Sequence, residues 1–285
     1  MFNNFIPNVW AAGINRELER LCVFVEDCNT QIEGSVKKQG ESVTILGVGK
    51  PTITTISKAG GKRELDDPET IADTSVIMYI NQLSYFNYQI DDIDEAQAKE
   101  NVDGTLKGET SEALANEIDK YVASKAADDN APKLYDAPVV IGSKEDEEGK
   151  EYVLDAVDKA IEKLQENDVA DSTPIVITIS PKFFRLFKKA YRFEDTNNSS
   201  ILKNGKIGMY GNVTVKKSNN VYRKNGVEYI MVRTKRAIAF AKPHTHTEAM
   251  RSAKWFCDVI RGFVLYDAKI VRPKEMVVIH AKYAA

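Results

Sequence analysis

The chain has 285 residues and a mass of 31.9 kDa, with 43% hydrophobic and 28% charged residues. These values are those of a folded globular protein, and they exclude a wholly disordered or fibrous chain. The formal net charge of −3 gives no overall attraction to nucleic acid or to an anionic membrane. The start of the chain lacks the pattern of a secretory signal, and no run approaches the roughly eighteen apolar residues of a membrane helix. We therefore expect a cytoplasmic, soluble protein with no membrane partner.

The N-terminal part of the chain predicts a short helix and then an extended hairpin. Apolar residues at helical spacing behind Pro7 predict an amphipathic helix over residues 8–21. Alternating segments on both sides of a turn at residues 38–41 predict a two-stranded hairpin within residues 31–58. Large apolar residues are sparse there, so the hairpin would be marginal by itself and should lie against a partner. The residues expected to make this contact are Ile32, Val36, Lys37, Lys38, Glu41, Val43 and Ile45.

A strand and a long acidic helix are predicted next. Alternation with a period of two predicts one strand over residues 74–90. The carboxylates that follow it suit the first turn of a helix, where the helix dipole favours negative charge. Helical spacing then continues to about residue 127, interrupted at Gly104 and Gly108. Residues 91–129 contain twelve acidic and four basic residues, a net charge of −8.

The second half of the chain predicts a packed α/β layer that is followed by β structure. Ser180 and Pro181 supply an N-cap and a first-turn proline for a helix behind a buried apolar strand. Asn225-Gly226 has the composition of a hairpin turn. The expected elements are helices at 153–164 and 181–191 and strands at 175–179, 213–216, 229–232 and 237–241.

Charge is distributed unevenly between two regions of the chain. Residues 235–274 contain nine basic and three acidic residues, a net charge of +6, in contrast to the acidic helix. Opposite charge on two regions of one molecule favours docking between neighbouring copies. The residues expected to take part are Asp91, Asp92, Asp94 and Glu95 on the acidic side and Arg251, Lys254 and Arg261 on the basic side.

No motif for nucleotide binding or hydrolysis is complete. Residues 47–52 have some likeness to a phosphate-binding loop, but that loop needs glycine where Thr44 stands and a hydroxyl side chain where Pro51 stands. Ser35 and Lys38 match the S-x-x-K spacing of one hydrolase class without its partner motifs. We therefore expect no catalytic residue and no cofactor, and an enzyme with an unrecognised cleft is the least favoured alternative.

Candidate metal ligands are few. His244 and His246 have the spacing of a strand pair, but Pro243 indicates a loop and no third ligand is apparent. The three cysteines are an odd number without a C-x-x-C pair, which fits neither a disulfide framework nor a zinc knuckle. We expect no metal site and buried thiols at Cys22, Cys28 and Cys257.

Aromatic and basic residues are interleaved in the helix predicted at 181–191. Stacking aromatics beside positive charge could bind nucleic acid. However, Phe183, Phe184, Phe187 and Tyr191 fall largely on one helical stripe with the basic residues beside it. Core packing with a basic side toward solvent or a subunit is therefore favoured.

The order of several segments resembles that of the major capsid proteins of tailed bacteriophages. Phe5 to Trp10 with its helix is similar to their N-terminal arm, and residues 32–36 with 40–45 resemble their extended loop. Residues 90–94 and the helix through Ile118-Asp119 resemble the start and the spine of their peripheral domain. The remaining segments with a counterpart are 179–184, 205–208 and 213–218 of the axial domain and the return strands 237–241, 248–251 and 264–269, where Asp267 stands at a usual glycine.

This resemblance implies an α+β fold of the Hong Kong 97 type. The implied parts are an N-terminal arm at 1–29, an extended β-hairpin loop at 30–65, a peripheral domain at 66–133 and 235–272, and an axial α/β domain at 134–234 and 273–285. The resemblance implies a structural subunit that forms hexamers and pentamers, in an icosahedral capsid built in the cytoplasm of a bacterial host. Implied partners are a portal, packaged double-stranded DNA held by non-specific contacts and, because the arm before residue 30 is short, a separate scaffolding protein. An encapsulin-like nanocompartment shell with the same fold is the alternative.

Overall fold

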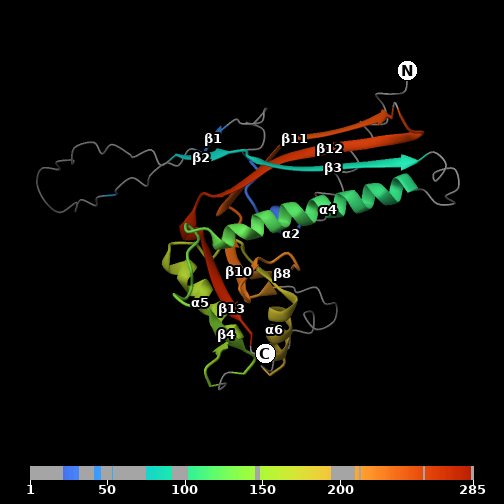
Figure 1. The fold of residues 1–285 in the computed structure, drawn as a ribbon. Coiled ribbons are helices and arrows are strands. Elements are labelled where there is room, and N and C mark those ends of the chain that lie inside the picture. The colour runs from blue at the N-terminus through green and yellow to red at the C-terminus, as the bar shows by residue number, and fades with distance from the viewer. Residues whose placement is uncertain are drawn as a thin grey trace, which may run out of the picture.

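The computed structural model is a mixed α and β structure with three sheets. It describes residues 22–31, 42–45, 53, 75–91, 102–144, 148–193, 209–211, 213–252 and 254–283. The helix predicted at 8–21 and the turn predicted at 38–41 lie outside these residues. Figure 1 shows an elongated lobe, in which a long sheet lies along one helix, and a compact lobe beside it.

The elongated lobe is an antiparallel three-stranded sheet covered on one face by a helix. Its strands are β3 (Gln82–Asp91), β11 (Ile238–Arg251) and β12 (Cys257–Ile270), in the order β11-β12-β3. The helix α4 (Val102–Ser124) runs along the sheet and continues into the 3-10 turn η2 (Lys125–Ala127). Side chains of β3 alternate between half-buried and exposed, because successive residues of a strand point to opposite faces.

The compact lobe is built on a sheet with the strand order β5-β4-β13-β10-β6-β8-β7 and β9 paired to β10. Two helices of the predicted α/β layer are present as α5 (Val153–Glu166) and α6 (Pro181–Phe193). The strands are β4 (Val139–Gly142), β5 (Glu151–Tyr152), β6 (Ile175–Ile179), β7 (Met209–Tyr210), β8 (Val213–Lys217), β9 (Arg223–Lys224), β10 (Val227–Thr234) and β13 (Met276–Lys282), the last preceded by the 3-10 turn η3 (Pro273–Glu275).

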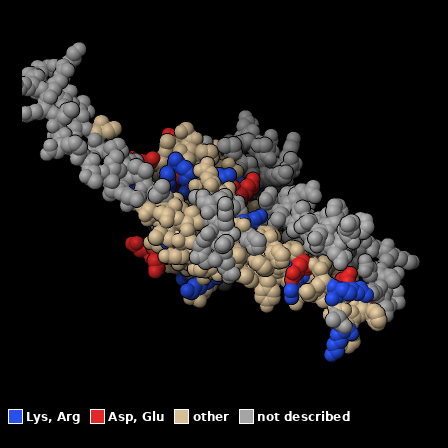
Figure 2. All heavy atoms as spheres, turned by 90° about the horizontal axis from the view of Figure 1, so that it is seen from above, with Lys and Arg blue, Asp and Glu red and all other residues tan. Residues whose placement is uncertain are grey.

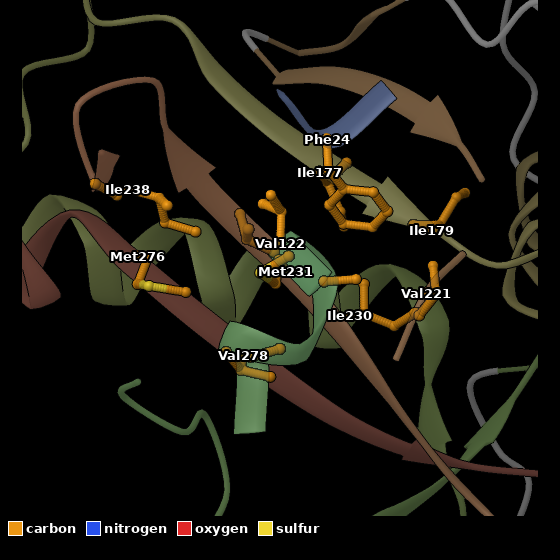
Figure 3. Close-up of a cluster of buried hydrophobic side chains, with 14 of the residues drawn as sticks. Phe24, Val122, Ile177, Ile179, Val221, Ile230, Met231, Ile238, Met276 and Val278 are labelled. Atoms are coloured by element: carbon orange, nitrogen blue, oxygen red, sulfur yellow. The ribbon is translucent and has the colours of Figure 1, made fainter. Parts of the chain in front are cut away.

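One buried core joins the two lobes. Figure 3 shows apolar side chains from α2, α4, the compact sheet and β11 gathered in one cluster, among them Phe24, Val122, Ile230 and Ile238. Each of these four side chains is at most 1% exposed. Burial of apolar surface on this scale is the main favourable contribution to folding, so the lobes are expected to unfold together.

The segment around α2 (Val23–Glu26) is fixed by polar groups that come from distant parts of the chain. The carboxylate of Asp119 in α4 accepts hydrogen bonds from the backbone nitrogens of Val23 at 2.7 Å and Phe24 at 3.1 Å. Arg233 of β10 donates to the carbonyl oxygens of Phe24 and Asp27. Burial raises the pKa of Asp119 from 3.8 to about 6, although these backbone donors favour its charged form.

Several predictions for the compact lobe and the cysteines are confirmed. The Ser180 hydroxyl caps α6 by accepting a hydrogen bond of 3.1 Å from the backbone nitrogen of Phe183. Phe183 and Phe187 are buried in the core, as core packing of the aromatic stripe requires. The residues of the predicted turn Asn225-Gly226 both have a positive φ, as the mirror-image hairpin turn demands. All three cysteines are buried thiols.

The single strand predicted over 74–90 is wrong. Two strands occupy it, β2 (Val76–Tyr79), which pairs with β1 (Ser42–Ile45), and β3 in the long sheet. The carboxylate of Asp267 accepts a hydrogen bond of 3.2 Å from the backbone nitrogen of Asn81, at the change of sheet. Alternation of exposure continues unbroken through this point, so the sequence pattern did not indicate the change of sheet.

The predicted start and interruption of the acidic helix are also corrected. Asp91 is the last residue of β3 and not part of a helix start, while residues 92–101 lie outside the described part of the chain. Gly104 and Gly108 lie inside the continuous helix α4. A glycine in a helix interior costs only about 1 kcal/mol relative to alanine, which the tertiary packing of the apolar face of α4 exceeds.

The loop predicted around Pro243 is instead part of β11. The strand continues through the proline, and its register against β12 shifts between Ala241 and His244. Proline lacks a backbone N–H, so it is tolerated at a bulge in an edge strand. His246 consequently lies in a strand, with its ring 5.6 Å from that of Phe263 and its Nε2 3.7 Å from Glu248.

Candidate intersubunit surface

Exposed large apolar side chains in the described part of the chain are confined to the elongated lobe and the segments attached to it. Tyr85 of β3 is 75% exposed and Phe256, in the turn between β11 and β12, is 81% exposed. No large apolar residue of the compact lobe is exposed among the residues that the structure describes there. The exposed large apolar residues are Ile53, Ile77, Tyr79, Leu83, Tyr85, Met250, Trp255 and Phe256. A soluble protein rarely leaves such a set uncovered unless it binds a partner.

The face of the long sheet that points away from α4 contains a groove of about 380 Å³. Tyr85, Phe263 and His246 lie opposite one another on the three strands and supply its apolar part. Arg261 and Glu248 form an ion pair in the next row, and the guanidinium holds the pKa of this carboxylate below its ordinary value. Figure 2 views the molecule from above and shows acidic and basic side chains dispersed over a mostly uncharged surface.

The opposite face of the sheet, where Phe86 lies over Gly262, explains why the central strand β12 has a glycine at this position. A Cβ atom there would lie 2.5 Å from Cζ of Phe86 and 2.7 Å from the carbonyl oxygen of His246. Atoms do not approach so closely, so any other side chain at this position would displace Phe86 or the strand backbone. The glycine therefore permits the aromatic ring to pack flat over the sheet.

A second groove, of about 540 Å³, runs between β3 and α4. Leu83, Tyr85 and Phe86 line it from the strand, and Ala113 and Leu114 line it from the helix. The carboxylates of Glu109 and Glu117 stand at its helical side, and Glu117 also pairs with Lys120 at 2.6 Å. This groove therefore combines apolar walls with negative charge.

The turn between β11 and β12 presents two aromatic side chains at the end of the elongated lobe. Trp255 is 65% exposed, and the Lys254 ammonium lies 5.7 Å from the centroid of its ring. The Ser252 hydroxyl accepts hydrogen bonds from the backbone nitrogens of Trp255 at 3.2 Å and Lys254 at 3.4 Å. The backbone nitrogen of Ser252 in turn donates to the carbonyl of Cys257 at 3.1 Å. These bonds hold the exposed turn in a defined conformation.

Two of the residues predicted for the assembly hairpin, Val43 and Ile45, are among the described residues. Val43 and Ile45 belong to β1, which pairs with β2 and not with another described part of the hairpin. Val43 is 7% exposed and packs in a small cluster with Met78 and Leu265 of its own chain. The remaining hairpin residues, Ile32, Val36, Lys37, Lys38 and Glu41, lie outside the described residues.

The residues predicted for charge docking that are described lie on the elongated lobe. Arg251 forms an ion pair with Asp258 at 3.1 Å, and both side chains are about half exposed. Asp91 is the cross-strand partner of Cys257, near the turn that carries Lys254. Arg261 pairs with Glu248, and Asp92, Asp94 and Glu95 lie outside the described residues. Arg251 and Arg261 are thus paired with carboxylates of the same lobe, which sequence counting did not reveal.

Within the described ranges, no group of three or more histidine, cysteine, aspartate and glutamate side chains is placed to bind a metal ion. No helix in that part of the chain is long and apolar enough to cross a membrane. Sequence reasoning missed the exposed aromatic turn. Its only sign in the sequence was the pair Trp255-Phe256, which Ser252 and Lys254 precede. Sequence reasoning also missed the buried pair Asp119 and Arg233, since their contacts with α2 span 95 and 209 residues of sequence.

Comparison with solved structures places this arrangement of lobes among viral shell proteins. A chain from Mycobacterium phage Che8 is 26% identical, with 90% of each chain covered and a TM-score of 0.69. A chain from the capsid of the cyanophage P-SCSP1u is 15% identical, covering 87% of this chain and 85% of that one at a TM-score of 0.63. The fold is that of phage capsid proteins. The predicted resemblance to phage capsid proteins is therefore confirmed, and the matches extend over both lobes of the fold.

The same fold is found outside phage particles. A chain from a virus-like particle of Pyrococcus furiosus is 11% identical, covering 95% of this chain and 98% of that one at a TM-score of 0.58. No protein-family profile matches the chain, and no curated protein sequence matches it. The capsid-protein fold is thus recognised here through its three-dimensional structure.

Proposed function

We propose that this chain is a structural subunit, without catalytic activity, that self-assembles into the icosahedral capsid of a tailed double-stranded DNA phage. The observation that carries the proposal is that the large apolar residues exposed in the described part of the chain lie in the elongated lobe and the segments attached to it, in a chain with the capsid-protein fold. Apolar surface that is exposed in the monomer becomes buried when copies associate. The subunit would occupy the virion capsid after assembly in the cytoplasm of a bacterial host.

The finer division into parts follows the Hong Kong 97 pattern. The elongated lobe corresponds to a peripheral domain at 66–133 and 235–272, with α4 as its spine. The compact lobe corresponds to an axial domain at 134–234 and 273–285, which would surround the symmetry axes of hexamers and pentamers. Residues 30–65 would form the extended loop on a neighbouring subunit. The sheet order and the single helix along β3 support this division.

The experiment is assembly of the purified full-length chain, followed by analytical sedimentation and negative-stain electron microscopy. Closed shells are the expected product, with a separate scaffolding protein supplied when the chain alone remains in small oligomers. Persistent monomers in both conditions would reject the proposal. A variant lacking residues 34–47, which include β1, should form no shells while the chain still unfolds in one thermal transition, and intact shells from it would reject the role of the loop.

The second candidate is an encapsulin-like compartment shell, favoured by the similarity to the Pyrococcus furiosus virus-like particle. The contents of particles isolated from the native host distinguish the two. A phage capsid should contain double-stranded DNA held by non-specific contacts and a portal at one vertex. Particles that contain a protein cargo, no portal and no DNA would establish the compartment instead.

A further inference from the structure

The groove between β3 and α4 has the chemistry of a docking site for a neighbouring copy, an inference that rests on the proposed shell function. Ser84 and Phe86 of β3 face α4 across this groove, and Leu83 and Tyr85, 45% and 75% exposed, border it at the edge of the strand. Its volume of about 540 Å³ lies in the range of sites that accept a large side chain or a small molecule. Glu109, Ala113 and Glu117 follow one another at intervals of four residues, so they lie along one side of α4. An aromatic group accompanied by positive charge would therefore complement this groove.

The turn between β11 and β12 has this chemistry. Trp255 and Phe256 project apolar surface, and Lys254 keeps its ammonium beside the indole ring. The hydrogen bonds from the backbone nitrogens of Trp255 and Lys254 to Ser252 hold the turn in place before it meets a partner. A preorganised aromatic anchor loses little conformational freedom on binding.

The turn cannot reach the groove of its own chain. Phe86, the groove residue of β3 nearest the turn, lies opposite Gly262, and Asp91 lies opposite Cys257 beside the turn. The five residue steps between these pairs extend about 17 Å at about 3.3 Å per residue. An aromatic turn that fills the groove must therefore come from another molecule.

We propose that the aromatic turn of one copy, Lys254 to Phe256, docks into the β3–α4 groove of a second copy. The indole and phenyl groups pack on Leu83, Tyr85 and Ala113, and the ammonium of Lys254 meets the carboxylates at Glu109 and Glu117. Because turn and groove are different patches of one molecule, the contact is heterologous. A heterologous contact builds rings when its rotation closes, which is the geometry that capsomers require.

The test is a disulfide crosslink between single cysteines placed on the two patches. Trp255→Cys and Ala113→Cys alter exposed positions, and the native cysteines are buried. Each full-length variant is assembled separately, the two are co-assembled in equal amounts, and all samples are oxidised and run on non-reducing gels. The co-assembled sample should give a covalent dimer, while each variant by itself should give at least tenfold less. A chain with both substitutions should give a ladder that ends at the ring size.

An exchange of charge between the turn and the groove supplies a second test. Lys254→Glu should reduce assembly, and Lys254→Glu combined with Glu109→Lys and Glu117→Lys should restore it, because attraction across the contact is re-established. Lys274→Glu, at an exposed residue outside the turn, is the matched control and should assemble like the native chain.

The outcomes separate this inference from the proposed function. Shells with a dimer from Trp255→Cys alone would show that turns meet turns and would overturn the groove contact. Shells with no crosslink in the mixed sample would overturn it as well, and both results would leave the shell function standing. Failure of the native chain to assemble in any condition would reject the shell function together with this inference.

Discussion

The guanidinium of Arg233 donates a hydrogen bond of 2.8 Å to the carbonyl oxygen of Phe24, which lies 209 residues earlier in the chain. Arg233 is 1% exposed, and its other amino group donates to the carbonyl of Asp27. Its Nε has no hydrogen-bond partner among the described residues, so the bonds to Phe24 and Asp27 offset only part of the cost of burying the charge. The carbonyl groups of the segment at residues 22–29 therefore reduce the free-energy cost of burying Arg233, and the segment and Arg233 stabilise each other.

Replacement of Arg233 by methionine is expected to lower the free energy of unfolding by about 3 kcal/mol. The variant leaves two buried carbonyl groups without these charged donors and removes positive charge near Asp119. Urea unfolding followed by far-UV circular dichroism measures the loss. Arg236→Met is the matched control, because Arg236 is half exposed and pairs with Glu275 at 3.3 Å on the surface, and it should change stability by less than about 1 kcal/mol. Equal effects of the two substitutions would contradict the buried role of Arg233.

The raised pKa of Asp119 should appear in the pH dependence of stability. Its folded-state value of about 6 exceeds the ordinary 3.8, so the folded protein binds this proton more tightly than the unfolded chain. The associated stabilisation, about 3 kcal/mol, is fully present below pH 3.8 and is lost as the pH rises through about 6.

The free energy of unfolding of the native chain minus that of Asp119→Asn should therefore fall by up to about 3 kcal/mol between pH 4 and pH 7. The lost acceptor in the amide variant adds an offset that does not depend on pH. Glu112→Gln, at an exposed position of the same helix, should give a flat difference. A carboxyl resonance of Asp119 that titrates near its ordinary value would contradict the assignment.

Two glycine-to-alanine substitutions should have opposite effects. Gly262→Ala forces a methyl group against Phe86 and the carbonyl of His246, and we expect a loss of about 1–3 kcal/mol. Gly108→Ala places its methyl in open space within α4, where alanine is favoured over glycine by about 1 kcal/mol. Thermal melts of the two variants provide the comparison. A destabilised Gly108→Ala or an unaffected Gly262→Ala would show that the packing described around these positions is wrong.

Asp267 should be energetically coupled to Tyr121. The Tyr121 hydroxyl donates to its carboxylate at 2.8 Å, and the backbone nitrogen of Asn81 donates at 3.2 Å. A double-mutant cycle with Tyr121→Phe and Asp267→Ala should give a coupling energy of about 1–2 kcal/mol. The cycle with Tyr222→Phe in place of Tyr121→Phe should give additive effects, since Tyr222 packs against Tyr229 in the compact lobe.

Assembly should weaken as salt rises if charge docking contributes to the intersubunit contact. Ions screen attraction between exposed charges over about 10 Å at 0.1 M salt. Light scattering of assembling protein at increasing sodium chloride measures the effect, and the variant Lys254→Glu should show a smaller salt dependence. Assembly that is insensitive to salt would remove the charge-docking hypothesis and leave the apolar contact.

Most local structure of the compact lobe, and the class of the protein, could be predicted from the amino-acid sequence. Ser180 and Pro181 signalled the start of α6 through chemistry within one helical turn, and the apolar stripe of α5 signalled its buried face. The order of weak segments along the chain was sufficient to indicate a phage capsid protein. These features depend on neighbours a few residues apart and on their succession, which a single sequence displays.

The points at which strands change sheets, and the charges that meet in the core, depend on tertiary structure. The alternation through Tyr79 and Asn81 continues without a break, so only Asp267 and the pairing with β1 divide β2 from β3. Pro243 indicated a loop, but the bulge in an edge strand removed the need for its missing donor. Arg233 and Asp119 lie in one buried cluster because folding brings distant segments together. The local sequence pattern does not indicate such contacts.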